Sequence, residues 1–211
     1  FLEIISRQAD RLNAIIEDLL MLSWLEKGAE AQPGRLEPGS LLEVLRAAID
    51  MCEKMAGEKN VTIEVQCEPS LTAPMNAHLL EQAVVNLVNN AVKYSEPGSR
   101  VHVSAAQEGE CVAIRVQDWG CGIERKHLPR LFERFYRVDK ARSRELGGTG
   151  LGLAIVKHIA LVHGANVAVE SKVGEGSTFS VHLPLVGRPA PVAADEGEDA
   201  CEITGGSTGA P

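Results

Sequence analysis

The chain has 211 residues, of which 45% are apolar and 24% are charged. These proportions are ordinary for globular proteins, and they exclude a fully disordered chain, a collagen and a disulfide-stapled miniprotein. The formal net charge of −8 disfavours binding to the phosphate backbone of nucleic acids. No apolar run approaches the ~20 residues of a membrane-spanning helix, and we expect no secretory signal. The five cysteines form no CxxC pair, which favours reduced cytoplasmic thiols over disulfides or a zinc site.

Residues 1–28 are predicted to form one long amphipathic helix, as though cut from a longer protein. Its apolar positions form a broad stripe at helical spacing: Phe1, Leu2, Ile5, Leu12, Ile15, Ile16, Leu19, Leu20 and Leu22. A stripe of this width is typical of helix bundles and requires a partner helix, which predicts a dimer or a missing N-terminal half. The alternative is a helix that docks on its own domain.

Residues 29–40 are rich in Gly, Pro and Gln, which indicates a linker. Within it, residues 35–37 are compatible with a short edge strand that Pro38 ends. From residue 187 to 211 the chain consists largely of Pro, Gly, Ala, Ser and acidic residues. Such a segment has little to bury, and we expect a disordered tail.

Residues 41–186 alternate between helical and strand patterns. Ser40 and Asn76 are typical N-caps for the first two helices of this region. The expected helices are 41–57, 77–94 and 149–163, with a further short helix before the last one. The expected strands are 61–65, 100–107, 111–117, 166–171 and 177–183. This order predicts an α+β fold in two layers, with a largely antiparallel sheet.

The helix at 77–94 carries the first pattern that points to chemistry. Asn86, Asn90 and Lys93 are spaced i, i+4, i+7 and therefore share one face. An amide oxygen is a suitable hard ligand for magnesium, and a lysine one turn further on suits a phosphate. The alternative is an ordinary solvated helix face.

A second motif, Asp118-Trp119-Gly120-Cys121-Gly122-Ile123, follows directly after an apolar strand. Glycines at alternate positions allow the backbone to approach a flat ligand closely. The Asp118 carboxylate can accept a hydrogen bond from an exocyclic amine. Taken alone, the motif is equally compatible with a common Asp–Gly turn.

A third motif, residues 147–153, places four glycines at the start of a helix. Exposed amides beside the positive end of the helix dipole can hold a polyphosphate. The motif matches neither a P-loop nor a dinucleotide fingerprint, and a flexible hinge is the alternative. The preceding segment, 125–144, has eight bases and two acids, a charge of +6 in an acidic chain. We expect it to act as a mobile lid over the glycine motif.

The order of these motifs resembles that of the sensor histidine kinases of two-component systems. NLVNNAVKYS, DWGCGI, LFERFYR, GGTGLGL and GEGSTF look like the N, first glycine, F, second glycine and third glycine boxes of that family. The resemblance spans residues 35–185 and implies the Bergerat-type ATP-binding fold shared with gyrase, Hsp90 and MutL, a two-layer α/β sandwich. Residues 1–28 look like the second helix of the family's dimerisation and phosphotransfer hairpin, and 41–186 would be the catalytic domain.

By position, the resemblance implies that Asn90 ligates Mg²⁺ and that Asp118 binds the adenine amine. Asn86, Lys93 and Arg137 would carry the catalytic contacts to the phosphates. The implied nucleotide contacts are Asn86, Asn90, Lys93, Tyr94, Asp118, Gly120, Gly122, Ile123, Phe132, Gly148, Thr149, Gly150, Leu151, Gly152 and Thr178. Phe135 would join Phe132 in anchoring the lid.

The resemblance implies transfer of the ATP γ-phosphoryl group to a histidine and then to an aspartate on a response-regulator receiver domain. It also implies a homodimer and a cytoplasmic fragment of a membrane-anchored parent. None of the six histidines has the sequence context of the family's phosphoacceptor, so we expect that histidine outside this chain. His158 and His163 are expected to be packing or surface residues.

Two other functions stay open. One is an ATP-hydrolysing conformational machine of the same fold. In the gyrase-like relatives a glutamate four residues before the metal asparagine activates water, whereas Asn86 stands there and cannot act as a general base. The other is a non-catalytic nucleotide-sensing module.

Overall fold

The computed structural model describes residues 2–31, 36–139 and 148–185 of the chain. Their core is a five-stranded sheet with the strand order β2-β4-β5-β7-β6. The bounds are β2 Thr62–Cys67, β4 Arg100–Glu108, β5 Cys111–Asp118, β6 Asn166–Lys172 and β7 Gly176–Pro184. β2 pairs with β4 in parallel, and the other neighbours pair antiparallel. The predicted two-layer α+β arrangement is thus present, with one parallel pair at the edge.

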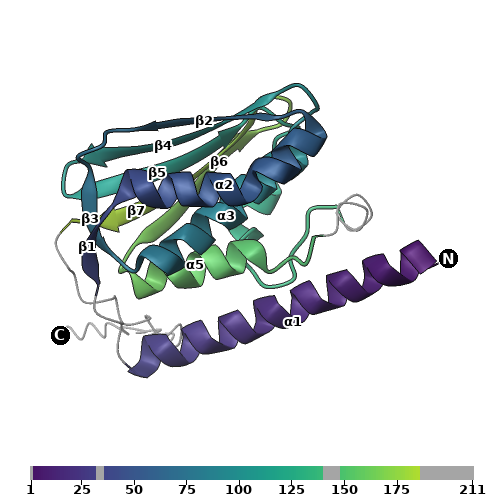
Figure 1. Cartoon of the computed structure of the whole chain (residues 1–211), viewed down its shortest axis with the longest axis horizontal. Helices are drawn as coiled ribbons and strands as arrows, with labels where there is room; N and C mark the ends of the chain where they lie inside the picture. The colour runs from purple at the N-terminus through teal and green to yellow at the C-terminus, as the bar shows by residue number, and fades with distance from the viewer. Residues whose placement is uncertain (1, 32–35, 140–147, 186–211) are drawn as a thin grey trace, which may run out of the picture.

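Three helices cover one face of this sheet (Figure 1). They are α2 Leu41–Lys59, α3 Ala77–Tyr94 and α5 Gly152–Val162. On α3, Val84, Leu87 and Val88 are at most 1% exposed, and they pack in one cluster with the inward side chains of the strands. The apolar stripe of α3 therefore faces the sheet, which leaves its polar stripe on the opposite side.

The helix starts follow the predicted caps. The side chain of Ser40 accepts a hydrogen bond from the backbone N–H of Glu43, and that of Asn76 accepts one from Leu79. The predicted bounds of α3 are confirmed, and α2 runs two residues further than predicted. It ends at Asn60, whose left-handed backbone (φ 56°) closes the helix with two hydrogen bonds.

Two predictions about short elements were wrong. The edge strand is β1 Glu37–Ser40, not 35–37, and it includes Pro38. It pairs with β3 Thr72–Met75, a strand that the sequence pattern did not reveal because Pro74 interrupts it. A two-stranded ribbon tolerates proline because only one side of each strand must be bonded. Likewise α5 begins at Gly152, not 149, since residues 148–151 are irregular and Gly150 has φ +80°.

The short helix before α5 is a 3-10 helix, η1 Arg125–Arg130. His163 ends α5 and is buried, and His158 is half-buried on the same helix, which agrees with the expectation of packing or surface residues. The expected tail at 187–211, the lid residues 140–147 and linker residues 32–35 lie outside the described residues.

The N-terminal helix α1, Leu2–Ala31, lies beside α5 on the side away from the sheet (Figure 1). It runs past the predicted end at 28. Leu22 and Leu25, 2% and 1% exposed, join the core of the domain. The docked alternative is thus confirmed for the C-terminal half of α1. Ile15 and Met21 are partly buried against the same core. Six other large apolar side chains of α1 are exposed: Ile5, Leu12, Ile16, Leu19, Leu20 and Trp24.

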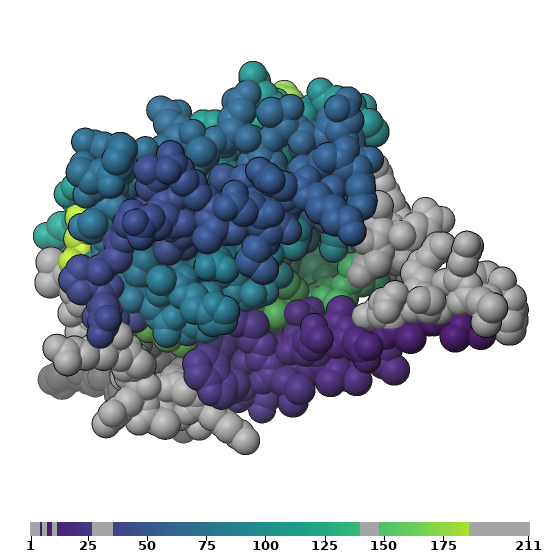
Figure 2. All heavy atoms as spheres, viewed as in Figure 1, coloured from purple at the N-terminus to yellow at the C-terminus, as the bar shows by residue number. Residues whose placement is uncertain are grey.

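In the space-filling view α1 closes the lower side of the molecule, with α5 visible between it and α2 (Figure 2). Among the described residues, no helix combines the length and the hydropathy needed to cross a bilayer.

Candidate functional site

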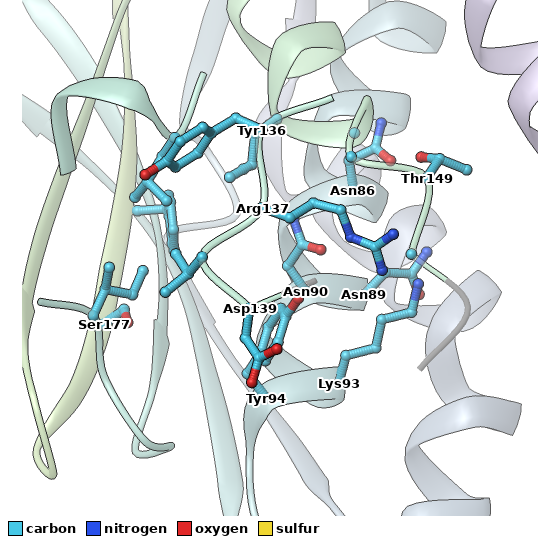
Figure 3. A pocket seen from close by; sticks show the side chains of 18 of the residues that line it. Asn86, Asn89, Asn90, Lys93, Tyr94, Tyr136, Arg137, Asp139, Thr149 and Ser177 are labelled. Atoms are coloured by element: carbon cyan, nitrogen blue, oxygen red, sulfur yellow. The ribbon is translucent and has the colours of Figure 1, made fainter. Parts of the chain in front are cut away.

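A pocket of about 430 Å³ lies where α3, the start of α5, the loop after β5 and α1 meet. Figure 3 shows it from close by. Its lining residues come from segments far apart in the sequence: Ala14, Asp18, Asn86, Asn89, Asn90, Lys93, Tyr94, Asp118, Cys121, Gly122, Ile123, Leu131, Tyr136, Arg137, Val138, Asp139, Gly148, Thr149, Gly150, Gly152, Leu153, Ser177 and Phe179. The Asn, Asp–Gly and glycine motifs thus converge on one cavity.

Helix α3 forms one wall through its polar stripe. Asn86, Asn90 and Lys93 all line the pocket, as their helical spacing predicted. Asn89 lines it as well, one turn before Lys93, and sequence reasoning missed it (Figure 3). Nδ2 of Asn86 is buried and lacks a hydrogen-bond partner among the described residues. A buried donor without a partner is costly, so this atom is suited to an acceptor oxygen of a ligand.

Lys93 is the cation of this wall. Burial lowers the pKa of its ammonium group, and the nearby Asp18 carboxylate acts in the opposite direction. A half-buried lysine that faces a cavity attracts anionic ligands more strongly than a solvated one, since screening by water is reduced.

Asp118 ends β5, lines the pocket and is 4% exposed. Burial raises the pKa of its carboxyl group, against hydrogen bonds from the backbone of Gly120 and Ser177. The Gly120 N–H donates to Oδ1 at 2.9 Å. The carboxylate is therefore held in place and keeps acceptor capacity for a ligand amine.

The glycines after Asp118 are required by packing within the domain. A Cβ at Gly120 would overlap the carbonyl oxygen of Tyr94, and one at Gly122 (φ +65°) would overlap that of Lys172. These glycines let the loop pack against the end of α3 and the β6–β7 turn. Their predicted role, clearance for a flat ligand, stays a prediction, and Gly122 does line the pocket.

The glycine loop before α5 forms the third wall. Gly148, Thr149 and Gly150 line the pocket, and a Cβ at Gly152 would come within 3.1 Å of Oδ1 of Asn86. Glycine at position 152 thus lets the start of α5 approach α3. The hydroxyl of Thr149 accepts from the N–H of Leu151 at 3.2 Å and donates to the carboxylate of Asp18 at 2.7 Å.

Residues 136–139 close the pocket from the lid side. Arg137 extends into the cavity in Figure 3, as expected for a residue that contacts a ligand there. The Phe135 N–H donates to the carbonyl of Gly150 at 2.9 Å, which ties this segment to the glycine loop. Phe135 has φ +61° and is 56% exposed, so it does not anchor the lid by burial.

Four predicted contact residues lie outside the lining. Gly120 packs behind the loop, and Leu151 is fully buried in the core. Phe132 packs edge-on against Phe179, with ring centroids 6.5 Å apart. Thr178 points to the other face of β7, because side chains alternate along a strand, and its neighbours Ser177 and Phe179 line the pocket instead.

Beyond Asn89, the residues that sequence reasoning missed are Ala14, Asp18, Cys121, Leu131, Tyr136, Val138, Asp139, Leu153, Ser177 and Phe179. Most are direct neighbours of predicted residues and could have been included on that ground. Ala14 and Asp18 gave no such signal, because they belong to α1, which was expected to form part of a separate hairpin.

Comparison with known proteins identifies the family. Residues 75–187 match the family model described as "Histidine kinase-, DNA gyrase B-, and HSP90-like ATPase". The phosphate regulon sensor protein PhoR of Pseudomonas aeruginosa is 37% identical over 195 residues, which are 92% of this chain and 43% of that protein. The sensor-like histidine kinase SenX3 of Mycobacterium bovis is 40% identical over 186 residues, 88% of this chain and 45% of that protein. The chain thus spans about half the length of these relatives.

Solved structures agree with the sequence relatives. The mycobacterial sensor histidine kinase MprB superposes with a TM-score of 0.62 at 30% identity, over 71% of this chain and 97% of that one. Full-length ShkA superposes with a TM-score of 0.68 at 28% identity, over 86% of this chain and 38% of that one. The chain belongs to the histidine kinase, gyrase B and HSP90-like ATPase family, and it comprises a catalytic ATP-binding domain of the sensor histidine kinase type.

Proposed function

We propose that the pocket binds ATP and that the chain, as part of a sensor histidine kinase, transfers the γ-phosphoryl group to a histidine outside residues 1–211. The phosphoryl group then passes to an aspartate on a response-regulator receiver domain. One observation carries the proposal: the Asn, Asp–Gly and glycine motifs line a single cavity of about 430 Å³. The related ShkA structure is a complex with AMPPNP, an ATP analogue, which supports a nucleotide as the occupant.

The base of the nucleotide is assigned to the Asp118 end. A carboxylate held by the Gly120 N–H can accept a hydrogen bond from an exocyclic amine. The apolar side chains of Ile123, Leu131 and Phe179 line the cavity and would contact the purine ring. A purine with a carbonyl in place of the amine would set an acceptor oxygen against the acceptor carboxylate, so the site favours adenine.

The phosphates are assigned to the part of the lining that carries Lys93, Arg137 and the glycine loop. Lys93, Arg137 and Nδ2 of Asn86 supply donors, and the amides of Gly148–Gly150 lie at the start of α5. In phosphoryl transfer the protein acts mainly by holding the phosphates and stabilising charge as it develops. Positive groups at this end would do both.

The residues fit a Mg²⁺ ion that arrives with the nucleotide. No three His, Cys, Asp or Glu side chains gather into a metal site in the parts of the chain that the structure describes. Magnesium commonly keeps its waters and takes one or two protein ligands plus phosphate oxygens. Asn90 would supply such a ligand through its amide oxygen. When bound, the ion would supply positive charge that offsets the charge of the phosphates.

The hydrolytic alternative stays open but is less favoured. The carboxylates that line the pocket are those of Asp18, Asp118 and Asp139, and helix α3 contributes none. Asn86 offers an amide where a water-activating base would stand, so we expect slow hydrolysis to solvent.

We propose further that the chain dimerises through its N-terminal helix and that it belongs to the cytoplasmic portion of a membrane-anchored sensor.

Calorimetry of ADP and AMPPNP with and without Mg²⁺ tests nucleotide binding. Asn90→Ala should reduce the Mg²⁺-dependent affinity roughly tenfold to a hundredfold, the equivalent of a charge-assisted bond. Asn166→Ala, at the exposed start of β6, is the matched control and should bind like the unmodified chain. No heat with any nucleotide would refute the proposal. Incubation with ATP and a separate hairpin that bears the histidine tests phosphoryl transfer itself.

A further inference from the structure

Helix α1 places a carboxylate inside the pocket. Ala14 and Asp18 line the cavity, and Leu22 and Leu25 on the same face of the helix are buried in the domain core. The spacing 14, 18, 22, 25 is that of one helical stripe. One continuous face of α1 therefore both docks on the domain and covers part of the pocket.

Asp18 makes two interactions at the wall assigned to the phosphates. The hydroxyl of Thr149 donates to its Oδ2 at 2.7 Å, and Lys93 attracts it electrostatically. Because a hydroxyl has one proton, Thr149 cannot donate to a second acceptor while it is bonded to Asp18. A hydroxyl and an ammonium group are the donors that a phosphate oxygen uses in proteins.

We propose that the Asp18 carboxylate occupies the position of a nucleotide phosphate, so that the docked N-terminal helix competes with the phosphates for Thr149 and Lys93. This inference rests on the proposed nucleotide site. A phosphate placed at Thr149 and Lys93 would meet the Asp18 carboxylate at close range, and two anions at that distance repel each other. Nucleotide binding then requires Asp18 to withdraw.

Withdrawal of Asp18 affects the whole docked half of α1. Leu22 lies one turn beyond Asp18, and Glu26, one turn further, pairs with Arg134 and lies 3.7 Å from Nε2 of His158. Because a helix moves as a stiff unit, displacement at Asp18 strains the contacts of Leu22 and Glu26. Bound phosphates therefore weaken the attachment of α1 to α5, and tight attachment of α1 weakens phosphate binding, as linkage requires.

The competition depends on phosphates and not on the base. Adenosine occupies the Asp118 end alone and should be insensitive to Asp18. ADP and AMPPNP reach Thr149 and Lys93 and should be sensitive, the triphosphate analogue at least as much as the diphosphate. A general effect of α1 on the stability of the domain would not depend on the number of phosphates that the ligand carries.

The test is calorimetric titration of adenosine, ADP and AMPPNP into the full chain and into Asp18→Asn, with Mg²⁺ present. Asp18→Asn should raise the affinity for ADP and AMPPNP about three- to thirtyfold, because it removes a like charge from beside the phosphates. The expected gain is modest because solvent partly screens that charge. Adenosine affinity should stay the same. Glu17→Gln is the matched control: it removes an equal charge from the adjacent exposed position and should have little effect.

Backbone hydrogen exchange provides a second measurement. AMPPNP should speed exchange of α1 amides around Leu22 in the unmodified chain, and adenosine should not.

Unchanged or reduced ADP affinity in Asp18→Asn would overturn the inference, and a reduction would indicate that Asp18 helps to hold the metal. If unmodified and variant chains bind no nucleotide at all, the proposed function itself fails. If both chains bind ADP and AMPPNP with equal affinities, only the proposed competition by Asp18 is refuted.

Discussion

The imidazole of His163 joins the two helices that carry the pocket. Its Nε2 accepts a hydrogen bond from the backbone N–H of Asn76 at 3.0 Å, and its Nδ1 donates to the carbonyl of Ile159 at 2.7 Å. Asn76 caps the start of α3, and His163 follows the end of α5. One buried ring therefore fixes the polar stripe of α3 relative to the glycine loop at the far end of α5.

This bond makes the stability of the domain depend on pH. Burial lowers the pKa of His163, and a ring that accepts at Nε2 must be neutral. A depressed folded-state pKa stabilises the fold above the unfolded value of about 6.5, and this contribution is lost as pH falls through the folded-state pKa. Urea unfolding at pH 7.5 and 5.5 should show a smaller loss of stability for His163→Gln than for the unmodified chain. His78→Gln, at an exposed position, should keep the full loss; equal losses in all three chains would contradict the assignment.

Two glycine-to-alanine changes should act in opposite directions. A Cβ at Gly120 overlaps backbone atoms of Tyr94, which cannot yield as a flexible side chain would. Gly57, inside α2, has open space around it. Gly57→Ala should therefore stabilise by roughly 0.5–1 kcal/mol through helix propensity, and Gly120→Ala should destabilise by more than ~1 kcal/mol. Thermal unfolding checks both, and a neutral Gly120→Ala would show that the loop is looser than described.

Much of the site was predictable from α3 alone. Asn86, Asn90 and Lys93 share a face by spacing, and Val84, Leu87 and Val88 fix that face by their burial, so both the wall and its orientation follow from one helical period. The same period would have added Asn89. Along β7 the family resemblance implied Thr178, whereas the period of two places its neighbours Ser177 and Phe179 together on the pocket face.

What sequence could not provide is contact between distant segments. No local pattern places Asp18 beside Thr149, because 131 residues separate them and the contact depends on how α1 docks. The reason for glycine at 120 and 122 was also out of reach. A motif shows that a Cβ is absent, and only the structure shows that Tyr94 and Lys172 are the groups that would meet it.

Cys121 should report occupancy of the pocket. It is exposed and lines the cavity, whereas Cys52 is buried and burial raises the pKa of its thiol to about 11. Because the thiolate is the reactive form, an alkylating reagent at neutral pH should modify Cys121 far faster than Cys52. ADP should slow modification of Cys121 severalfold and leave Cys111, at the far end of β5, unaffected. Mass spectrometry of the three cysteine peptides measures these rates, and equal rates for Cys121 with and without ADP would place the nucleotide elsewhere.

The exposed face of α1 should mediate self-association. Leu20 is 66% exposed and lies among the exposed side chains of Ile16, Leu19 and Trp24, a contiguous apolar surface of the kind that marks protein contacts. Met51, 62% exposed, is the only exposed large apolar side chain of α2, which makes it a matched control. Light scattering at rising protein concentration should show weaker dimerisation for Leu20→Glu than for Met51→Glu, since a charge in an apolar contact is costly. Equal dimerisation of both variants would assign the interface to another surface. A monomer in every case would mean that α1 needs its partner helix from outside this chain.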